Sequence, residues 1–326
     1  MAQFFLHIGL HKTGTTTLQK YILPNIDDST INYNPSELFK LLHKLQYRYE
    51  MAEDVKINIV DKAKNWVNNY NKKEKILISN ENLSQLGFLQ NYEESATILK
   101  DIFPNANILL VLRYQPSWLI SCYKQSLKMG DWQSIEDFLQ FRNGKFNNIE
   151  GFYNSNDLLH MNVHKADWTN LISIYKKLFK NVNILFHENF VSNPSNFVQD
   201  FTDIINIKKP SGLNYAKKYN KSMSNSEVLL KSNLSYMLNT VGPPYFLTYK
   251  QKRFIHYNLF YNNNISTNNR NTLQRYRNIN NYTLNLIDKL IKYLPASNKS
   301  KIISQSTSNA LHNMFKTSNK NIPFYQ

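Results

Sequence analysis

A short stretch near the N-terminus holds the residue types that bind and act on anions. Gly9 and Gly14 are separated by four residues, which is the spacing of a phosphate-binding glycine turn. Between and just after the two glycines lie side chains that can donate hydrogen bonds or carry charge: His11, Lys12, Thr13, Thr15, Thr16 and Thr17. Hydroxyls, backbone N–H groups and one ammonium gathered on a turn predict a site for a phosphate-like group.

The residues on either side place this turn between a strand and a helix. Residues 3–8 are aromatic and aliphatic and predict a strand, while residues 18–23 predict a helix that stops at Pro24. The order strand, glycine turn, helix aims backbone N–H groups and the positive end of the helix dipole at one point. An anion is the natural occupant of that point.

The turn is close to a Walker A loop but differs from it in the place of the lysine. A Walker loop has a lysine directly after the second glycine, whereas this chain has Thr15 there and carries Lys12 inside the turn. No later predicted strand ends in the aspartate that would complete a magnesium site. The sequence therefore predicts no metal, and a P-loop kinase or NTPase acting on a small molecule is kept as an alternative.

A second block of residues fits another phosphate contact. Residues 107–112 predict a buried strand that ends at Arg113, and a helix is expected from Pro116 onward. The planar guanidinium suits a phosphate, and Ser121 falls about two helical turns further along the chain. Taken alone, Arg113 is also a surface cation and Ser121 an ordinary helix residue. Their pairing with the glycine turn is what favours a shared ligand.

Together the two blocks resemble the sulfotransferases that use 3′-phosphoadenosine 5′-phosphosulfate (PAPS). Residues 11–19 are similar to the 5′-phosphosulfate loop of that family, and Arg113 with Ser121 is similar to its 3′-phosphate block. The resemblance covers residues 1–205, and residues 123–139 are similar to a bacterial, carbohydrate-acting group. It implies transfer of a sulfuryl group from PAPS, without a metal, to a hydroxyl or amine. The residues it implies for PAPS binding are Lys12, Thr13, Gly14, Thr15, Thr16, Thr17, Arg113 and Ser121.

Sulfuryl transfer needs a cation at the leaving phosphate and a group that takes the proton of the acceptor. Lys12 is the expected cation. Residues 75–79 predict a strand, and Glu81 follows its end, where ligands gather in open α/β sheets. Some carbohydrate sulfotransferases are similar in placing a catalytic glutamate there, but Glu81 equally fits a helix-capping or arginine-pairing carboxylate. His11 and His164 are the second choices for the base.

Charge narrows the choice of partners. The chain of 326 residues carries 39 Lys and Arg against 23 Asp and Glu, a formal net charge of +16. The basic residues are scattered rather than gathered in a block, which argues against nucleic acid as a partner. A basic surface attracts an anionic donor, and the expected acceptor is a carbohydrate or glycolipid. A non-enzymatic polyanion-binding protein is the third alternative, but it leaves Arg113 and Ser121 without a role.

Cysteine content and hydropathy predict the compartment. The chain has one cysteine, Cys122, so no intrachain disulfide can form. It has no apolar run of the length that spans a bilayer. A strand expected from residue 3 leaves no room for a signal peptide. We therefore expect a cytoplasmic protein without stable membrane insertion.

The expected fold is α/β, a three-layer sandwich with a central, mostly parallel sheet, a P-loop-like strand–loop–helix and a helical C-terminal part. Predicted strands and helices alternate over residues 1–205, which favours a sheet with helices on both faces. The expected division is a single sulfotransferase domain over residues 1–295, with a helical lid or cover over residues 210–295. Residues 296–326 are expected to form a loosely held tail.

Overall fold

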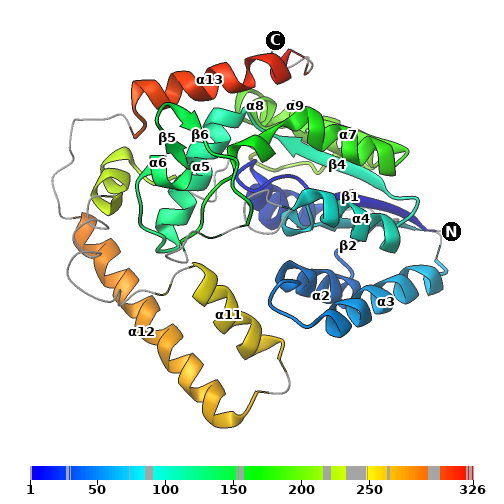
Figure 1. The fold of residues 1–326 in the computed structure, drawn as a ribbon. Helices are drawn as coiled ribbons and strands as arrows, with labels where there is room; N and C mark the ends of the chain where they lie inside the picture. Colours follow the sequence, from blue (N-terminus) through cyan, green and yellow to red (C-terminus); the bar gives the residue numbers. More distant parts are fainter. Residues whose placement is uncertain are drawn as a thin grey trace. The chain divides into compact units, whose positions relative to one another are not determined.

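Figure 1 shows the fold as a computed structural model of the chain. It describes residues 2–325 except for positions 27–28, 30, 73, 85–90, 152, 154–157, 216–221, 233–246, 248, 263–264, 293–301, 321 and 323–324. The chain divides into two compact units. The first comprises Met1–Trp118, Lys165–Lys221 and Phe315–Gln326, and the second comprises Leu119–His164 and Ser222–Met314.

A five-stranded sheet forms the centre of the first unit. Its strands lie side by side in the order β2, β3, β1, β4, β7, and every pairing is parallel. Their bounds are β1 Gln3–His7, β2 Ile31–Tyr33, β3 Lys75–Ser79, β4 Asn107–Leu112 and β7 Asn181–Phe186. The predicted α/β class with a central parallel sheet is confirmed.

Helices of the first unit cover this sheet. They are α1 (Thr15–Thr17), η1 (Leu18–Ile22), η2 (Leu23–Asn25), α2 (Ser36–Lys44), η3 (Leu45–Tyr47), α3 (Glu53–Asn69), η4 (Glu81–Leu83), α4 (Tyr92–Ile102), α7 (Trp168–Leu178), α8 (His187–Ser192) and α9 (Pro194–Ile204). All six residues of β4 are buried, as expected of a parallel strand with cover on each side. On one face, Phe5, Leu77 and Leu109 form a core cluster with residues of η1 and α9. The helices α4 and α7 pack on each other over the other face.

The segment after the glycine turn differs from the single helix predicted over residues 18–23. It is helical from Thr15 onward, because α1 continues into a π-helical turn, η1, and then a 3₁₀ turn, η2. Pro24 lies inside η2 instead of stopping the helix, because the first positions of a helical turn do not use the N–H that proline lacks. Short π-helical turns of this kind occur often at functional sites.

The register of the sheet brings three strand ends to one edge. His7 at the end of β1 lies opposite Ser79 at the end of β3. Beyond β1, the amides of Ile8 and Leu10 donate to carbonyls of β4 at 3.1 and 3.3 Å, so the chain continues along β4. The residues that follow β1, β3 and β4 therefore meet at the carboxyl edge of the sheet, where ligands bind in parallel α/β folds.

The second unit begins inside α5 (Gln115–Lys128) and ends inside α13 (Gln305–Asn319). Its other elements, or those at its border, are α6 (Ile135–Phe138), β5 (Phe141–Arg142), β6 (Lys145–Phe146), η5 (Val163–Ala166), α11 (Tyr249–Phe260) and α12 (Thr267–Lys292). Strands β5 and β6 pair as an antiparallel hairpin. Among the described residues of both units, no helix is long and apolar enough to cross a membrane.

The single domain predicted over residues 1–295 stays a prediction, and the two compact units cut across it in sequence. Residues 119–164, expected to be part of the core, group instead with most of the C-terminal helices. The expected loose tail over residues 296–326 contains α13, in which Leu311 and Phe315 are buried. Apolar side chains at helical spacing explain this difference, because they give the segment a face to bury.

Candidate active site

The glycine turn changes direction at two residues with left-handed backbone. Lys12 has a φ of 67° and Gly14 has a φ of 89°. Only glycine fits at position 14, because an added Cβ would lie 2.7 Å from Cδ1 of Phe190. A lysine at positive φ is strained by roughly 1–2 kcal/mol. Residues that a fold holds in strained conformations cluster at functional sites, which draws attention to Lys12.

Three consecutive carbonyl groups of the turn, at residues 10–12, are each held by a side-chain donor. Thr13 Oγ1 donates to the first at 2.6 Å, Trp118 Nε1 to the second at 2.8 Å and Arg113 Nη1 to the third at 3.0 Å. A trans peptide directs its N–H opposite to its C=O. The amides of residues 11–13 are therefore directed away from these donors, as in a turn that receives an anion.

The start of the helix adds donors to the same turn. Gly14 is the N-cap of α1, and no side chain caps the helix. The amides of Thr17 and Leu18 donate to the carbonyl of Gly14 at 3.0 and 3.3 Å, which are the first hydrogen bonds inside the helix. The preceding amides, those of Gly14 and Thr15, have no acceptor within the helix and are directed into the turn.

The predicted threonines of the turn lie in different surroundings. Thr13 is fully buried and its hydroxyl is used on a carbonyl of the turn, so its amide is the group left for a ligand. Thr15 and Thr17 are also buried, whereas Thr16 is half-buried. Among the four threonines, Thr16 therefore presents the most accessible hydroxyl.

Glu81 lies beside the turn, as its place after β3 predicts. Its Oε2 accepts a hydrogen bond of 2.6 Å from Gln19 Nε2, and its Oε1 lies 3.8 Å from Nδ1 of His11. The same Gln19 amide also donates to the carbonyl of Ser79 at 3.3 Å. The structure thus brings together two of the predicted base candidates, Glu81 and His11, and adds Gln19, which the sequence analysis did not single out.

The carboxyl group of Glu81 is ionised at neutral pH. Burial raises its pKa, but the charge of His11, the amide of Glu81 itself and the hydrogen bond from Gln19 together outweigh burial, so that the pKa falls below its usual value. A carboxylate with a lowered pKa is available to accept a proton at neutral pH but is a weak base. It suits a reaction in which the acceptor loses its proton late.

His7 is a second buried polar group under the turn, and sequence reasoning missed it. Its Nδ1 lies 2.7 Å from Ser79 Oγ, and its ring meets Phe201 edge-on with centroids 5.1 Å apart. Burial lowers the pKa of His7 to about 4, with the charge of Glu81 acting weakly in the opposite direction. His7 is therefore neutral at physiological pH. Its position in an apolar strand gave no sign that Ser79 and Glu81 would lie beside it.

The pKa of His7 makes the stability of the fold depend on pH. The unfolded chain takes up the proton at the ordinary pKa of 6.5, whereas the folded chain takes it up only at about 4. The contribution of His7 is therefore complete above the unfolded pKa and falls by about 3 kcal/mol as the pH drops to the folded pKa. We expect urea denaturation at neutral pH and near the folded pKa to show a smaller acid-induced loss for His7→Phe than for the wild type.

A matched variant separates this titration from the hydrogen bond that His7 makes. Ser79→Ala removes the Oγ partner but keeps the buried imidazole. It should therefore lower stability at both pH values and leave their difference close to that of the wild type. Equal acid-induced losses in the wild type and in His7→Phe would show that another group is responsible.

Arg113 lies at the end of β4, as predicted, and fixes the turn. Its Nη1 holds the carbonyl of Lys12, and its Nε donates to Ser117 Oγ at 3.0 Å. Its own carbonyl accepts a hydrogen bond of 2.7 Å from Trp168 Nε1. The serine beside Arg113 is thus Ser117, one helical turn before the Ser121 that the sequence favoured.

Two of the predicted site residues belong to the second unit. Ser121 lies in the later part of α5, and Nε2 of the exposed His164 is 3.1 Å from the carbonyl of Phe146. Their roles stay predictions. Within the part of the chain that the structure describes, no three His, Cys, Asp or Glu side chains gather as metal ligands would.

Glu188, which follows β7, holds the segment that carries Arg113. Its Oε1 accepts a hydrogen bond of 2.9 Å from the amide of Tyr114, and its Oε2 accepts one of 3.4 Å from the hydroxyl of Tyr325. The carboxylate therefore lies at the start of α5, where negative charge is favourable. Glu188 positions the end of β4 instead of facing the turn.

Comparison with known proteins adds two structures. No family model and no curated protein matches the chain. The sulfotransferase of Alicyclobacillus acidocaldarius is similar at 14% identity and a TM-score of 0.42, over 72% of this chain and 92% of that one. Mouse sulfotransferase SULT7A1, solved in complex with PAP, is similar at 15% identity and a TM-score of 0.36, over 85% of this chain and 88% of that one. Similarity at this level assigns no activity to the chain.

Proposed function

We propose that the chain is a sulfotransferase that moves a sulfuryl group from PAPS to a hydroxyl or amine, on a carbohydrate or glycolipid. The proposal rests mainly on one observation: the carbonyl groups of residues 10–12, called the tied carbonyls below, each accept a hydrogen bond from a side chain. Because these carbonyls point toward their side-chain donors, the N–H groups of the turn point the other way, and Lys12 belongs to the same turn. This arrangement fits the 5′-phosphosulfate of PAPS, which presents adjoining anionic groups.

The place of Lys12 favours sulfuryl transfer over phosphoryl transfer. A sulfuryl group carries less charge than a γ-phosphoryl group, so one ammonium can neutralise the bridging oxygen as it leaves. Magnesium-dependent P-loop enzymes use an acidic residue at a strand end. Here β4, which lies directly beside β1, ends in the cation Arg113.

Each group of the turn has one part in this proposal. The amides of Gly14 and Thr15, with the hydroxyl of Thr16, hold the 5′-phosphate, assisted by the amide of Thr13 and by the helix start at Thr17. Lys12 stabilises the negative charge that develops during transfer. PAPS supplies the sulfuryl group. Catalysis of this kind depends on positioning and on donors that are fixed before the reaction begins.

Glu81 is the proposed proton acceptor. It is ionised, it lies beside the turn, and Gln19 and His11 fix its two oxygens. A weak carboxylate base is adequate for a loose transition state, since protein kinases use an aspartate in the same way. His11 is the second proposed base, because its ring lies against Glu81, and His164 is the third.

The 3′-phosphate of PAPS is assigned to Arg113 and Ser121. A guanidinium has five N–H donors, two of which are placed on Ser117 and on the carbonyl of Lys12. These contacts fix the guanidinium beside the turn, where its charge can attract a phosphate. The proposed acceptor is anionic or hydroxyl-rich, in keeping with the net charge of +16.

The proposed setting is the cytoplasm, since a chain with one cysteine holds no internal disulfide.

Titration calorimetry with three nucleotides tests the proposal. We expect 3′,5′-ADP to bind tightly with and without magnesium, and 5′-AMP and ATP to bind weakly. Labelled PAPS would then allow acceptors to be screened. Magnesium-dependent preference for ATP would overturn the proposal in favour of a kinase or NTPase. Salt-sensitive binding of polyanions with no nucleotide binding would replace it with a binding protein.

The variant Arg113→Ala tests how PAPS is selected. We expect it to narrow the affinity gap between 3′,5′-ADP and 5′-AMP, because loss of a charge-assisted contact costs roughly 2–5 kcal/mol. Affinity for both nucleotides should also fall, because the carbonyl of Lys12 loses its donor. The ratio of the two affinities separates these effects. Arg113→Lys keeps the positive charge but loses the planar guanidinium, so its affinity ratio should lie between those of the wild type and Arg113→Ala. A ratio in Arg113→Ala equal to that of the wild type would contradict a role for Arg113 in binding the 3′-phosphate.

A further inference from the structure

A groove lies between α2 and α3 in the first unit, apart from the glycine turn. Its volume is about 750 Å³, which is within the range of small-molecule sites. The residues that line it are Ser36, Glu37, Lys40, Leu41, Lys44, Lys62, Asn65, Trp66, Asn69 and Tyr70. None of them takes part in the chemistry proposed above.

The two helices pack through other residues and leave this groove at the surface. Their buried side chains are Leu38 and Leu42 in α2 and Ile59 and Ala63 in α3. The groove is formed by neighbouring stripes at helical spacing, in which most side chains are lysines, asparagines or other polar groups. Aromatic rings and the alkyl stems of the lysines supply apolar surface, and the polar groups beside them can fix a ligand that carries hydroxyls.

Three features of the lining describe the ligand. The lining contains three lysines, Lys40, Lys44 and Lys62, and one carboxylate, Glu37, so the groove attracts negative charge. Lys40 and Lys62 are exposed and make no hydrogen bond or ion pair with a described residue. The side-chain amides of the two asparagines, Asn65 and Asn69, can each donate and accept, which suits neighbouring hydroxyl groups.

An aromatic pair forms one end of the α3 stripe. The rings of Trp66 and Tyr70 are stacked, with centroids 4.7 Å apart and an angle of 25° between their planes. The hydroxyl of Tyr70 accepts a hydrogen bond of 3.4 Å from Asn32, which fixes the pair against β2. A rigid aromatic face beside amides and ammonium groups can cover the flat apolar face of a ring-shaped ligand.

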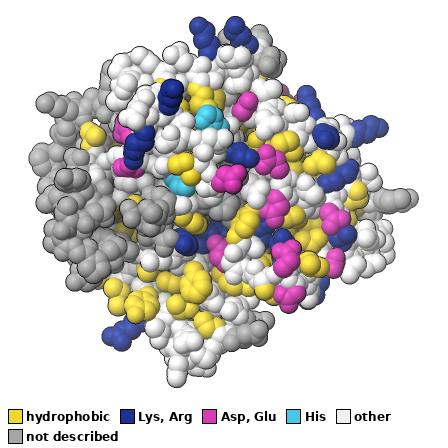
Figure 2. Space-filling model, in the orientation of Figure 1, with side chains coloured by type: hydrophobic (Ala, Val, Ile, Leu, Met, Phe, Trp, Pro, Cys, Tyr) yellow, Lys and Arg dark blue, Asp and Glu magenta, His cyan; other side chains and the backbone are white. Residues whose placement is uncertain are grey.

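The surface around the groove limits the length of an anionic ligand. In Figure 2, acidic side chains gather over α2, α3 and α4. Helix α3 begins with Glu53 and Asp54, and Glu94 of α4 lies 3.6 Å from Lys56. A long polyanion that followed α3 away from the groove would therefore meet carboxylates. A short ligand would not.

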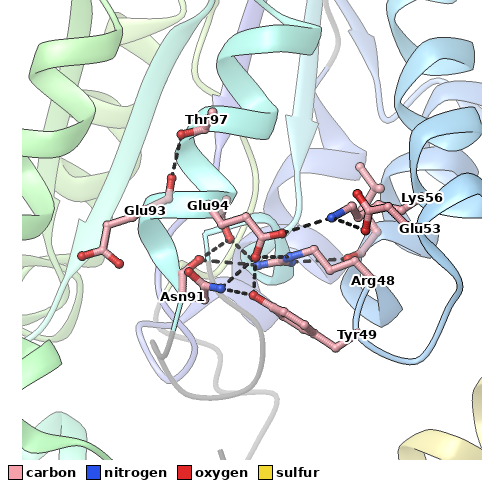
Figure 3. Close-up of polar contacts among 10 residues, drawn as sticks. Arg48, Tyr49, Glu53, Lys56, Asn91, Glu93, Glu94 and Thr97 are labelled. Carbon is pink, nitrogen blue, oxygen red and sulfur yellow. Dashed lines mark hydrogen bonds and ion pairs between the residues drawn. The ribbon is translucent and has the colours of Figure 1, made fainter. Parts of the chain in front are cut away.

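Figure 3 shows how firmly these carboxylates are held. Glu94 accepts hydrogen bonds from Tyr49 and from Asn91, the latter at 2.7 Å, and lies 3.4 Å from Nε of Arg48. Burial raises the pKa of Glu94, but the hydrogen bond from Tyr49 and the charge of Arg48 outweigh burial and lower it. Glu94 is therefore ionised at neutral pH.

From these observations we infer that the α2–α3 groove binds a short acidic saccharide, one that carries a carboxylate or sulfate on a mono- or disaccharide. The lysines contact its acidic group, the asparagines its hydroxyls, and the Trp66–Tyr70 pair the face of a sugar ring. The inference does not depend on what the glycine turn binds. If the glycine turn binds PAPS and the groove binds a saccharide, the chain has a saccharide site separate from the one at which a sulfuryl group would be transferred.

Calorimetry on the full chain tests the groove with a glucuronate-containing disaccharide and its methyl ester, which differ in the negative charge and in one methyl group. We expect the acid to bind more tightly than the ester. Trp66 also gives an optical signal, because it is half-buried while the other tryptophans, Trp118, Trp132 and Trp168, are buried. Addition of the acid should therefore change tryptophan fluorescence.

Lysine variants of the same helix provide the matched control. Lys62→Gln should weaken binding of the acid by about fivefold, and Lys40→Gln with Lys62→Gln by about tenfold or more. Lys64→Gln, whose lysine is paired with Asp101 outside the groove, should leave the affinity unchanged. Circular dichroism and melting temperature would confirm that each variant is folded.

Four results would overturn the inference. These are equal binding of acid and ester, equal loss in Lys62→Gln and Lys64→Gln, no binding of the disaccharide at millimolar concentration, and tighter binding of a short oligonucleotide that Lys62→Gln abolishes. The last would assign the groove to single-stranded nucleic acid, which also combines aromatic faces with lysines.

Discussion

Lys12→Ala is expected to lower kcat with PAPS by about a thousandfold, because one preorganised donor to a developing charge is commonly worth that much. Binding of 3′,5′-ADP should weaken but stay measurable, since the tied carbonyls at residues 10–12 keep the amides of the turn in place. Single-turnover rates with labelled PAPS, together with calorimetry, would measure the two effects separately.

Two further variants isolate the side chain from the backbone at position 12. The φ of 67° strains alanine as much as lysine, whereas glycine adopts it without strain. Lys12→Gly should therefore keep the turn intact and still lose turnover. Lys20→Ala, which removes an exposed lysine from the following helical segment, should behave as wild type. Turnover that survived in Lys12→Gly would remove Lys12 from the mechanism.

Gly14→Ala is expected to destabilise the fold by about 3 kcal/mol, of which roughly 1–2 kcal/mol is the cost of a left-handed alanine and the rest is overpacking. The new Cβ would lie 2.7 Å from Phe190, whose ring packs on Phe197 with centroids 5.0 Å apart. Phe190 therefore has limited room to move. Urea denaturation measures the loss of stability, and calorimetry with 3′,5′-ADP should show that the altered turn no longer binds.

The chain contains a matched control for this substitution. Gly212 also has a positive φ, 71°, but no atom lies within 4 Å of the Cβ it would gain. Gly212→Ala should thus show only the backbone cost. In a Phe190→Ala background, the cost of Gly14→Ala should fall to the same level, because the steric part is lost. If Phe190→Ala gave no relief, the contact between Gly14 and Phe190 would not be the cause.

The strand, the glycine turn and the helix after it could be predicted because the residues that form them are neighbours in the sequence. Residues 3–8, Gly9 and Gly14 lie next to one another in the chain, and a strand followed by a glycine turn and a helix has few structural solutions. Arg113 and Glu81 were found by the same means, because each follows a strand that its own residues predict. The parallel sheet then follows from the alternation of strands and helices.

Contacts that depend on the register between strands could not be read in this way. His7 meets Ser79 only because β1 and β3 pair in the register that sets these two residues opposite each other. Gln19 reaches Glu81 across a separation of 62 residues, and Trp118 reaches the turn across 107. No short window of sequence contains both members of such a pair.

The grouping of residues 119–164 with later segments could not be predicted from the sequence for a related reason. The predicted boundary near residue 205 followed a change in composition, but residues 119–164 group with segments later in the chain. Helix α5 passes from one unit to the other without a break, and Pro116, close to the border, lies in the first turn of this helix instead of in a linker. Composition detects a linker, and a border inside a helix has none.

The tied carbonyls also have a consequence for how the protein is made. The glycine turn leaves the ribosome early, but Arg113 and Trp118, which hold two of its carbonyls, are synthesised 101 and 107 residues after the residues they bind. Until then, carbonyls and amides of the turn face water in no fixed direction, and the turn cannot select an anion. If the turn binds nucleotide as proposed, a nascent chain can bind it only after β4 and the start of α5 have emerged and docked, and the ligand then stabilises only chains that have passed this point.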